Sequence, residues 1–184
     1  MRRSIPIRLA LIALFAWATA VFADTIASRS AELRLEEDHY VIDADFDLNL
    51  NATLEEAIGR GVPLYFVIEF DVWRPRLLWL DDLVASQAIT YRLSYSALTR
   101  QYRLSTGGAF YQNLGTLDEA LRVISRLRGR NIVEKSVLQK GVRYEAAVRL
   151  RLDTTQLPKP FQISALTSRE WNLQSDWVRW SFTP

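Results

Sequence analysis

The stretch "YVIDADFDLNL", residues 40–50, decides the fold, because apolar and polar side chains alternate along its whole length. Its apolar positions are Tyr40, Ile42, Ala44, Phe46, Leu48 and Leu50, with acids or asparagine at most positions between them. Successive side chains of a β-strand point to opposite faces of the sheet. This alternation therefore predicts a strand with one buried face, as in an antiparallel sheet.

The same period of two recurs in residues 64–72, 89–95 and 142–152. Shorter strands are indicated at 31–36 and 102–104. A last strand, 171–182, changes phase near Trp177, which predicts a bulge there. Its core residues are expected to be Trp171, Leu173, Trp180 and Phe182.

Two segments have the sequence of short helices. "TLEEAIGRG" begins at Thr53 and "TLDEALRVISRLRG" at Thr116, and each has a glutamate three residues after the threonine. This spacing predicts a capping box, with Gly129 ending the second helix. The elements together predict a mainly β fold, an antiparallel β-sandwich of roughly seven to nine strands with two short α-helices.

The N-terminal segment, residues 1–23, is typical of a secretory signal peptide. Arg2, Arg3 and Arg8 precede an apolar run, residues 9–22, that is too short to span a bilayer. Small residues favour cleavage after Ala23, with Ala20 as the second choice and a retained anchor as the alternative. We therefore expect a periplasmic protein with a single domain, residues 24–184, and no membrane segment after cleavage.

Composition limits the partners and the chemistry. Three of the 23 basic residues lie in the signal segment, which has no acid, so the remainder carries 20 basic and 21 acidic side chains. This balance argues against nucleic acid as a partner. The chain has no cysteine and only His39 as a histidine. Thiol nucleophiles, histidine-rich metal sites and a lipid-bearing cysteine are thereby excluded.

The acids Asp43, Asp45 and Asp47 fall on one face of the first strand. They could bind calcium, but the glycine-punctuated loop that usually gathers such ligands is missing. We favour a solvated face paired across strands with Arg143, Arg149 and Arg151. We expect no metal, no cofactor and no enzymatic activity.

The best candidate binding surface combines an aromatic residue with several cations. Trp73 is predicted on the strand face opposite Phe70 and Val72, beside Arg74 and Arg76, and Pro75 marks an edge, a bulge or a bend. There it could stack on a partner, but we favour the alternative that a second layer or a helix covers it. The segment with Arg100, Tyr102 and Arg103 is expected to extend this surface. Lys159 is a further candidate, since Pro158 and Pro160 hold it in an extended conformation.

Three functions are compatible with these features. The leading hypothesis is a non-enzymatic binding or adaptor module for a periplasmic or membrane-bound protein. The first alternative is a carrier of an apolar ligand, in a lumen lined by Phe66, Phe70, Tyr91 and Tyr95. A hydrolase of envelope glycans is the third, because a catalytic carboxylate pair leaves little local signature.

Three segments carry a resemblance to a known family. They are "GVPLYFVIEFDVWR", "LSYSALTRQYRLSTGG" and "LRLDTTQLPKPFQISALTSREWNLQSDWVRW". They resemble the domain-of-unknown-function family numbered 4390, which comprises exported proteins of Gram-negative bacteria. The resemblance implies no catalytic residues. It implies a link to envelope signalling, because members are described as encoded beside a sensor kinase of the nitrogen-regulation type.

Overall fold

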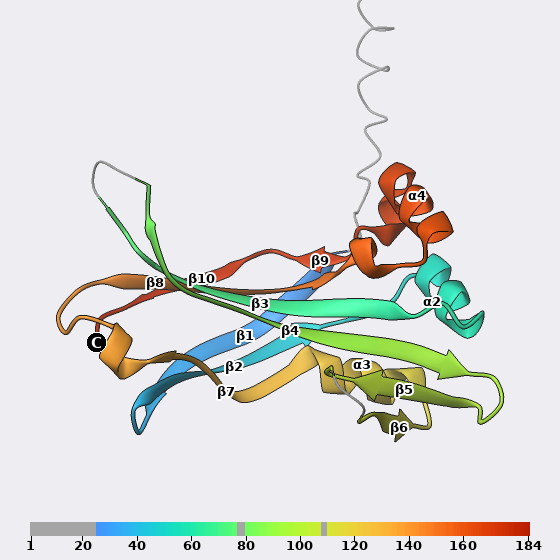
Figure 1. The fold of residues 1–184 in the computed structure, drawn as a ribbon, viewed down its shortest axis with the longest axis horizontal. Coiled ribbons are helices and arrows are strands. Elements are labelled where there is room, and N and C mark those ends of the chain that lie inside the picture. The colour runs from blue at the N-terminus through green and yellow to red at the C-terminus, as the bar shows by residue number, and fades with distance from the viewer. Residues whose placement is uncertain (1–24, 77–79, 108–109) are drawn as a thin grey trace, which may run out of the picture.

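The computed structural model describes residues 25–76, 80–107 and 110–184 as one strongly curled β-sheet with short helices at its margins (Figure 1). The predicted signal peptide, residues 1–23, lies outside the described residues. In the described segments, none of the helices is long and apolar enough to cross a membrane.

The sheet has ten strands in the order β6-β5-β4-β3-β8-β9-β1-β2-β7, and β10 also pairs with β8. Among the pairings of the described residues, only the short contact between β1 and β9 is parallel. The strands are β1 (Thr25–Glu36), β2 (His39–Asp47), β3 (Leu64–Arg74), β4 (Asp82–Ser96), β5 (Gln101–Ser105), β6 (Gln112–Leu114), β7 (Arg126–Glu134), β8 (Tyr144–Leu152), β9 (Gln174–Ser175) and β10 (Val178–Phe182).

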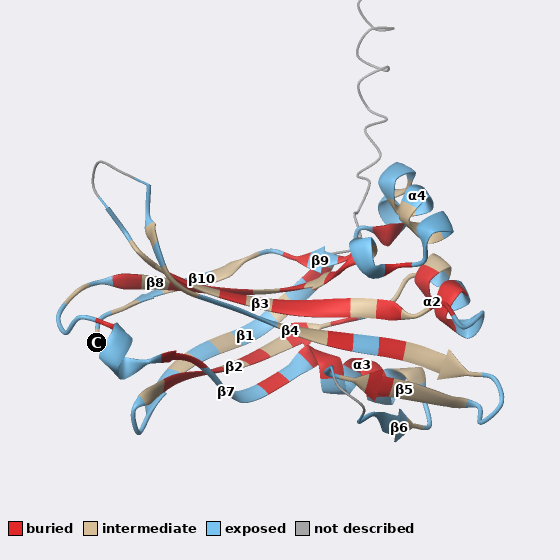
Figure 2. Ribbon diagram, viewed as in Figure 1, coloured by how far each residue is buried: buried red, intermediate tan, exposed pale blue. Residues whose placement is uncertain are grey.

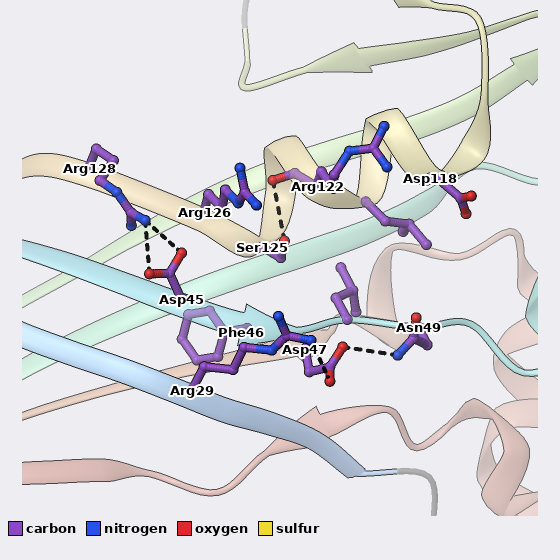
Figure 3. Close-up of a pocket in the computed structure, with 12 residues that line it drawn as sticks. Arg29, Asp45, Phe46, Asp47, Asn49, Asp118, Arg122, Ser125, Arg126 and Arg128 are labelled. Atoms are coloured by element: carbon purple, nitrogen blue, oxygen red, sulfur yellow. Dashed lines mark hydrogen bonds and ion pairs between the residues drawn. The ribbon is translucent and has the colours of Figure 1, made fainter.

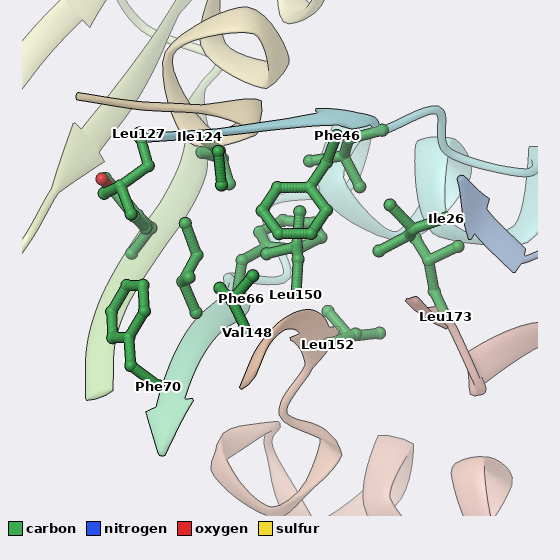
Figure 4. Packing of buried hydrophobic residues seen from close by; sticks show 14 of the residues in the cluster. Ile26, Phe46, Phe66, Phe70, Ile124, Leu127, Val148, Leu150, Leu152 and Leu173 are labelled. Atoms are coloured by element: carbon green, nitrogen blue, oxygen red, sulfur yellow. The ribbon is translucent and has the colours of Figure 1, made fainter. Parts of the chain in front are cut away.

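The curl of the sheet brings its two halves face to face around one apolar core. Phe66 and Leu150 come from the half with β3 and β8, and Phe46 comes from the half with β2 (Figure 4). Ile42 of β2 belongs to the same cluster. All four are at most 4% exposed. Burial alternates along these central strands, as the period of two predicted (Figure 2). The mainly β class is confirmed.

The finer expectation of an antiparallel sandwich differs from the architecture found. A sandwich has two separate sheets, whereas here Ile26 of β1 pairs with Ser175 of β9 and joins both halves into one mixed sheet that forms a curled half-barrel. Alternating apolar and polar residues indicate which face of a strand is buried, but they do not indicate which strand lies beside it. The two architectures therefore have the same sequence pattern.

Helices cover the end of the core where β2 and β3 meet their loops. Helix α2 (Ala52–Gly59) is capped by Asn51, whose Oδ1 accepts a hydrogen bond of 3.0 Å from the backbone of Leu54. Thr53, the expected cap, instead donates its hydroxyl to Glu170, 2.8 Å away. In helix α3 (Leu117–Ser125) the predicted capping box of Thr116 and Glu119 is confirmed.

Helix α3 ends earlier than predicted. It stops at Ser125, and the chain continues without a loop into β7, where Gly129 has a left-handed backbone with φ of 56°. The Gly129 amide donates to Asp43 Oδ1 at 2.7 Å. Gly129 therefore belongs to an irregular strand and does not end the helix.

The C-terminal region contains a helix that the sequence analysis did not predict. Helix α4 (Lys159–Thr167) follows Pro158, and Pro160 lies in its first turn, where proline needs no backbone donor. The segment expected to be extended is therefore helical from Lys159 onward. Short 3-10 turns precede and follow it, at Thr154–Gln156 and Arg169–Trp171, and a third lies at Lys135–Val137.

The predicted core residues of the last strand divide into two groups. Trp171 and Leu173 are buried, at 5% and 3% exposed. Trp180 and Phe182 are half-buried and pack against the same core. The phase change near Trp177 corresponds to the break between β9 and β10.

The acids of β2 are paired with arginines, though not with the predicted ones. Asp43, Asp45 and Asp47 form ion pairs with Arg34, Arg128 and Arg29 at 2.7, 2.7 and 2.9 Å. Arg149 and Arg151 bind Glu69 of β3 instead, and Arg143 lies near Glu145. In the described residues no group of three or more potential metal ligands is gathered. The ladder is a cross-strand ionic face with different partners, since β2 lies between β1 and β7 and not beside β8.

Candidate functional site

The most distinctive surface is a seam between β4 and β7, where the curled sheet stops short of closing. Residues 92–96 of β4 pair with β5, whereas residues 82–91 pair only with β3 on their other side. Strand β7 pairs only with β2. Among the described residues, two strand edges therefore lack a backbone partner, and they approach each other.

One side chain bridges the seam. Gln87 of β4 donates a hydrogen bond of 2.9 Å from its Nε2 to the carbonyl oxygen of Ile132 in β7. A side chain in this position replaces the backbone ladder that would close a barrel. The seam is therefore held at this point and opens beyond it.

Beyond Gln87 the seam widens into an open groove of about 510 Å³. Residues 88–91 of β4 form one wall, and β7 and α3 form the other. The lining residues are Ala88, Ile89, Thr90, Tyr91, Thr106, Val123, Arg126, Leu127, Arg128 and Arg130. This lining combines apolar side chains with three arginines and contains no acid.

The arginines of the groove differ in their partners. Arg128 is held by both carboxylate oxygens of Asp45, at 2.7 and 2.8 Å. In the part of the chain that the structure describes, the exposed guanidinium groups of Arg126 and Arg130 form no ion pair. Burial raises the pKa of Tyr91 in the same groove, and the nearby charge of Arg130 opposes that effect. The groove thus presents two exposed guanidinium groups beside a phenol, and the charge of Arg126 also acts on Asp45.

A second open cleft, of about 600 Å³, lies on the other side of Arg126, between the end of β2 and α3 (Figure 3). Asp45 and Asp47 point into it, and each is held by an arginine. Their hydrogen bonds to Arg128 and Arg29 lower the pKa of both carboxyl groups. Arg122 of α3 extends over this cleft and adds a further exposed cation (Figure 3).

The predicted Trp73 surface is occupied by contacts within the chain. Arg74 and Arg76 both bind Asp82, at 2.6 and 2.8 Å. The Trp73 ring packs edge-on against Trp177 at 6.2 Å, and Arg179 lies over its face at 5.9 Å. The outward side of β3 therefore carries an aromatic and arginine layer, and Trp73 is half-buried in it.

The other predicted residues are not brought to the same place. Trp73 pairs with the beginning of β4 and Tyr102 with its end, so that about 40 Å of strand separates them at the usual rise per residue. Tyr102 packs against Tyr95, and Arg103 lies over the Tyr111 ring. Arg100 is exposed in the turn before β5, and Lys159 is exposed at the start of α4. The expected continuous surface is therefore two separate ones, and the further candidate Lys159 lies on another element, α4.

Comparison with known proteins gives a family and no relative of known function. The model of a domain of unknown function, DUF4390, matches residues 23–181. The chain belongs to this family. No curated protein and no solved structure matches it.

The family resemblance noted in the sequence is thus confirmed across nearly the whole domain. The seam residues of β7 were missed because residues 116–129 were interpreted as one helix, whereas residues 89–91 of β4 were predicted as part of a strand. A signal was present: Arg126, Arg128 and Arg130 alternate with the period of a strand.

Proposed function

We propose that this DUF4390 protein is an exported, non-enzymatic binding module that accepts an extended segment of a partner protein in the seam between β4 and β7. The main support for the proposal is that two neighbouring strand edges, residues 82–91 of β4 and strand β7, each lack a strand partner on one side in the described residues. Exposed edges offer backbone donors and acceptors to any added strand. Addition of a peptide strand to such an edge is a recurrent mode of recognition.

The rest of the site favours binding over hydrolysis. A glycoside hydrolase needs a carboxyl group with a raised pKa as its general acid. In the larger cleft, arginines lower the pKa of Asp45 and Asp47, which is the opposite condition.

A carrier of apolar ligands is also less well supported. Phe66 and Phe70, expected to line a lumen, are at most 2% exposed and belong to the packed core (Figure 4). Tyr95 packs on Tyr102 with 5.0 Å between ring centres. Tyr91 alone of the four predicted residues lines one of the grooves described above.

Export to the periplasm is part of the same proposal. Its support is the basic and apolar character of residues 1–23, followed by small residues ending at Ala23. The mature protein purified from the periplasm should begin at Asp24, as measured by intact mass. The partner is then a periplasmic protein or the outer part of a membrane protein, and the sensor kinase implied by the family resemblance is one candidate.

Site-specific photo-crosslinking in cells tests the proposal. A photoreactive amino acid replaces Ala88 or Val123 in the groove, and Ile163, which is 67% exposed on α4, serves as the control position. Both groove positions should crosslink to one short contiguous segment of the same protein. Crosslinking no stronger than at Ile163 would contradict the proposal.

A further inference from the structure

We infer that two copies of this chain associate through the outer edge of β1, which pairs antiparallel with β1 of the second copy around Leu33. This edge is distinct from the seam, because β2 lies between β1 and β7. The inference therefore goes beyond the proposed function, and the dimer does not use the seam of either copy.

Most of β1 has a strand on one side only. Between residues 27 and 36 it pairs with β2, whereas its pairing with β9 is limited to Thr25 and Ile26. In the described part of the chain, β10 pairs with β8 and with no other strand. The turn between β1 and β2 also lies apart from β8 and β10 (Figure 1). Residues 27–36 therefore present an unpaired backbone edge that another strand can join.

The backbone of β1 determines which residues can bond to a second copy. Along an antiparallel strand, every second residue directs its N–H and C=O groups toward the same neighbour. Glu36 and His39 close the two-residue turn between β1 and β2, so Glu36 directs these groups to β2. The residues at odd positions, Ala31, Leu33 and Leu35, then direct theirs to the free edge. Two copies can pair only with these odd positions opposite each other.

The charges of β1 select one register among those that remain. Glu32 and Arg34 are exposed on the same face of the strand. When Leu33 lies opposite Leu33 of the second copy, Glu32 lies opposite Arg34, and symmetry makes this pair occur twice. Sliding the second copy by two residues in either direction places Glu32 opposite Glu32 or Arg34 opposite Arg34. Opposite charges in such positions attract and like charges repel, so the register centred on Leu33 is favoured.

The same register covers an exposed apolar side chain. Ala31, Leu33 and Leu35 lie on the face of β1 that is turned to the core, and the first two pack against it. Leu35 is nevertheless 45% exposed. In the dimer it lies opposite Ala31 of the second copy, with Leu33 of that copy as its diagonal neighbour. Association would therefore remove apolar surface from water.

A second copy also supplies a cation to Glu32. Within the chain, Glu32 lies opposite Asp43 of β2, and two acids in this position repel each other. Arg34 lies 2.7 Å from Asp43 and 3.4 Å from Glu36, whereas Glu32 forms no ion pair with any described residue. Arg34 of the second copy would offset the repulsion between Glu32 and Asp43, since a guanidinium group has donors for several acceptors.

Single cysteines test the register, because the chain has no cysteine of its own. Leu33→Cys should form a disulfide between two copies on mild oxidation, since Cα atoms of such a pair lie about 5.5 Å apart. Leu35→Cys is the matched control. It lies four residues, or about 13 Å, from its counterpart in the second copy and should cross-link at least about tenfold more slowly. Equal rates at the two positions would overturn the inference.

Charge reversal tests the same interface by sedimentation of the protein purified from the periplasm. The wild type should dimerise with a dissociation constant below about 1 mM. Glu32→Lys places like charges opposite each other twice and should weaken dimerisation by about tenfold. The double variant Glu32→Lys, Arg34→Glu brings opposite charges together again and should restore it. Glu55→Lys, an equal change of charge at an exposed position on α2, should have no effect.

The remaining outcomes are decisive. A protein that stays monomeric up to about 1 mM would overturn the inference. So would a dimer that Glu32→Lys leaves unchanged, because its interface would lie elsewhere. Circular dichroism and urea unfolding establish that each variant is folded. None of these results bears on the seam, which the photo-crosslinking experiment tests separately.

Discussion

The side-chain amide of Gln87 donates a 2.9 Å hydrogen bond to the backbone carbonyl of Ile132, and so joins two strands that share no backbone ladder. One exposed side chain thus bridges the edges of β4 and β7 across the gap in the half-barrel. A full ladder here would close the sheet and remove the edges. The hydrogen bond of Gln87 limits how far β4 and β7 can separate, but it does not occupy their unpaired backbone edges.

Gln87→Leu should loosen the seam. The change removes one hydrogen bond, which we expect to reduce the free energy of unfolding by about 1 kcal/mol. Hydrogen exchange in residues 82–91 and in β7 should become faster, while exchange in the paired β3 stays the same. Ser86→Leu, at the exposed neighbouring position, is the matched control and should change neither quantity. Unchanged exchange in the Gln87 variant would mean that the bridge does not hold the seam.

Glu69 should make stability depend on pH. Burial alone would raise its pKa, but hydrogen bonds from Arg151 and Arg149 outweigh burial and hold the pKa below its ordinary value. A lowered pKa in the folded state means that Glu69 stabilises the protein fully above the unfolded pKa, about 4.3. This contribution is lost as the pH falls from there through the folded pKa.

Glu69→Gln tests that dependence. At neutral pH the variant should lose about 1–3 kcal/mol of unfolding free energy, because two half-buried arginines lose their charged acceptor. The difference from wild type, measured by urea unfolding, should shrink below pH 4.3. Glu145→Gln is the control in β8, since its carboxylate lies 3.9 Å from Arg143. A Glu69 difference that stays constant down to acid pH would contradict the assigned ion pairs.

Thr116→Ala should destabilise α3 through the loss of its cap. The Thr116 hydroxyl accepts a hydrogen bond of 3.2 Å from the Glu119 amide, and Glu119 bonds back to the backbone of Thr116. Loss of such a cap costs about 1 kcal/mol. Thr53→Ala, in the similar sequence before α2, should cost less, because Asn51 caps that helix. Equal losses in urea unfolding would indicate that Thr53 also acts as a cap.

The contrast between these two threonines shows how far local sequence predicts structure. Both are followed by glutamate at the third position, but only at Thr116 does the backbone form the box. At α2 the helix begins earlier, because Asn51 is a good cap and also donates to the backbone of Glu170, far along the chain. Sequence patterns predict that a helix exists more reliably than where it begins.

Strands whose apolar residues alternate could be predicted, including residues 89–91 at the seam, whereas residues 82–88 of β4 and the whole of β7 could not. Residues 40–47, 64–72 and 144–152 alternate because one face of each strand packs on the core. The first half of β4 and most of β7 are edges with little burial, so their sequences carry a weak apolar period. An edge strand that lacks a partner on one side can bind another strand, but it also buries few side chains. Its sequence therefore lacks the alternation of apolar residues by which a strand is recognised. The pairing of Arg128 with Asp45 likewise depends on strand order, which alternation does not specify.

Gly129→Ala should reveal the irregularity that sets the direction of the seam arginines. Gly129 lies between Arg128 and Arg130 with φ of 56°, where the pairing of β2 with β7 shifts register. A Cβ there would meet no atom within 4 Å, so any cost comes from the backbone alone. A left-handed alanine costs about 1–2 kcal/mol. Gly129→Asn should cost less, because asparagine tolerates this conformation. Urea unfolding measures both, and equal losses for alanine and asparagine would mean that the strand shifts to a regular register, turning Arg130 away from the groove.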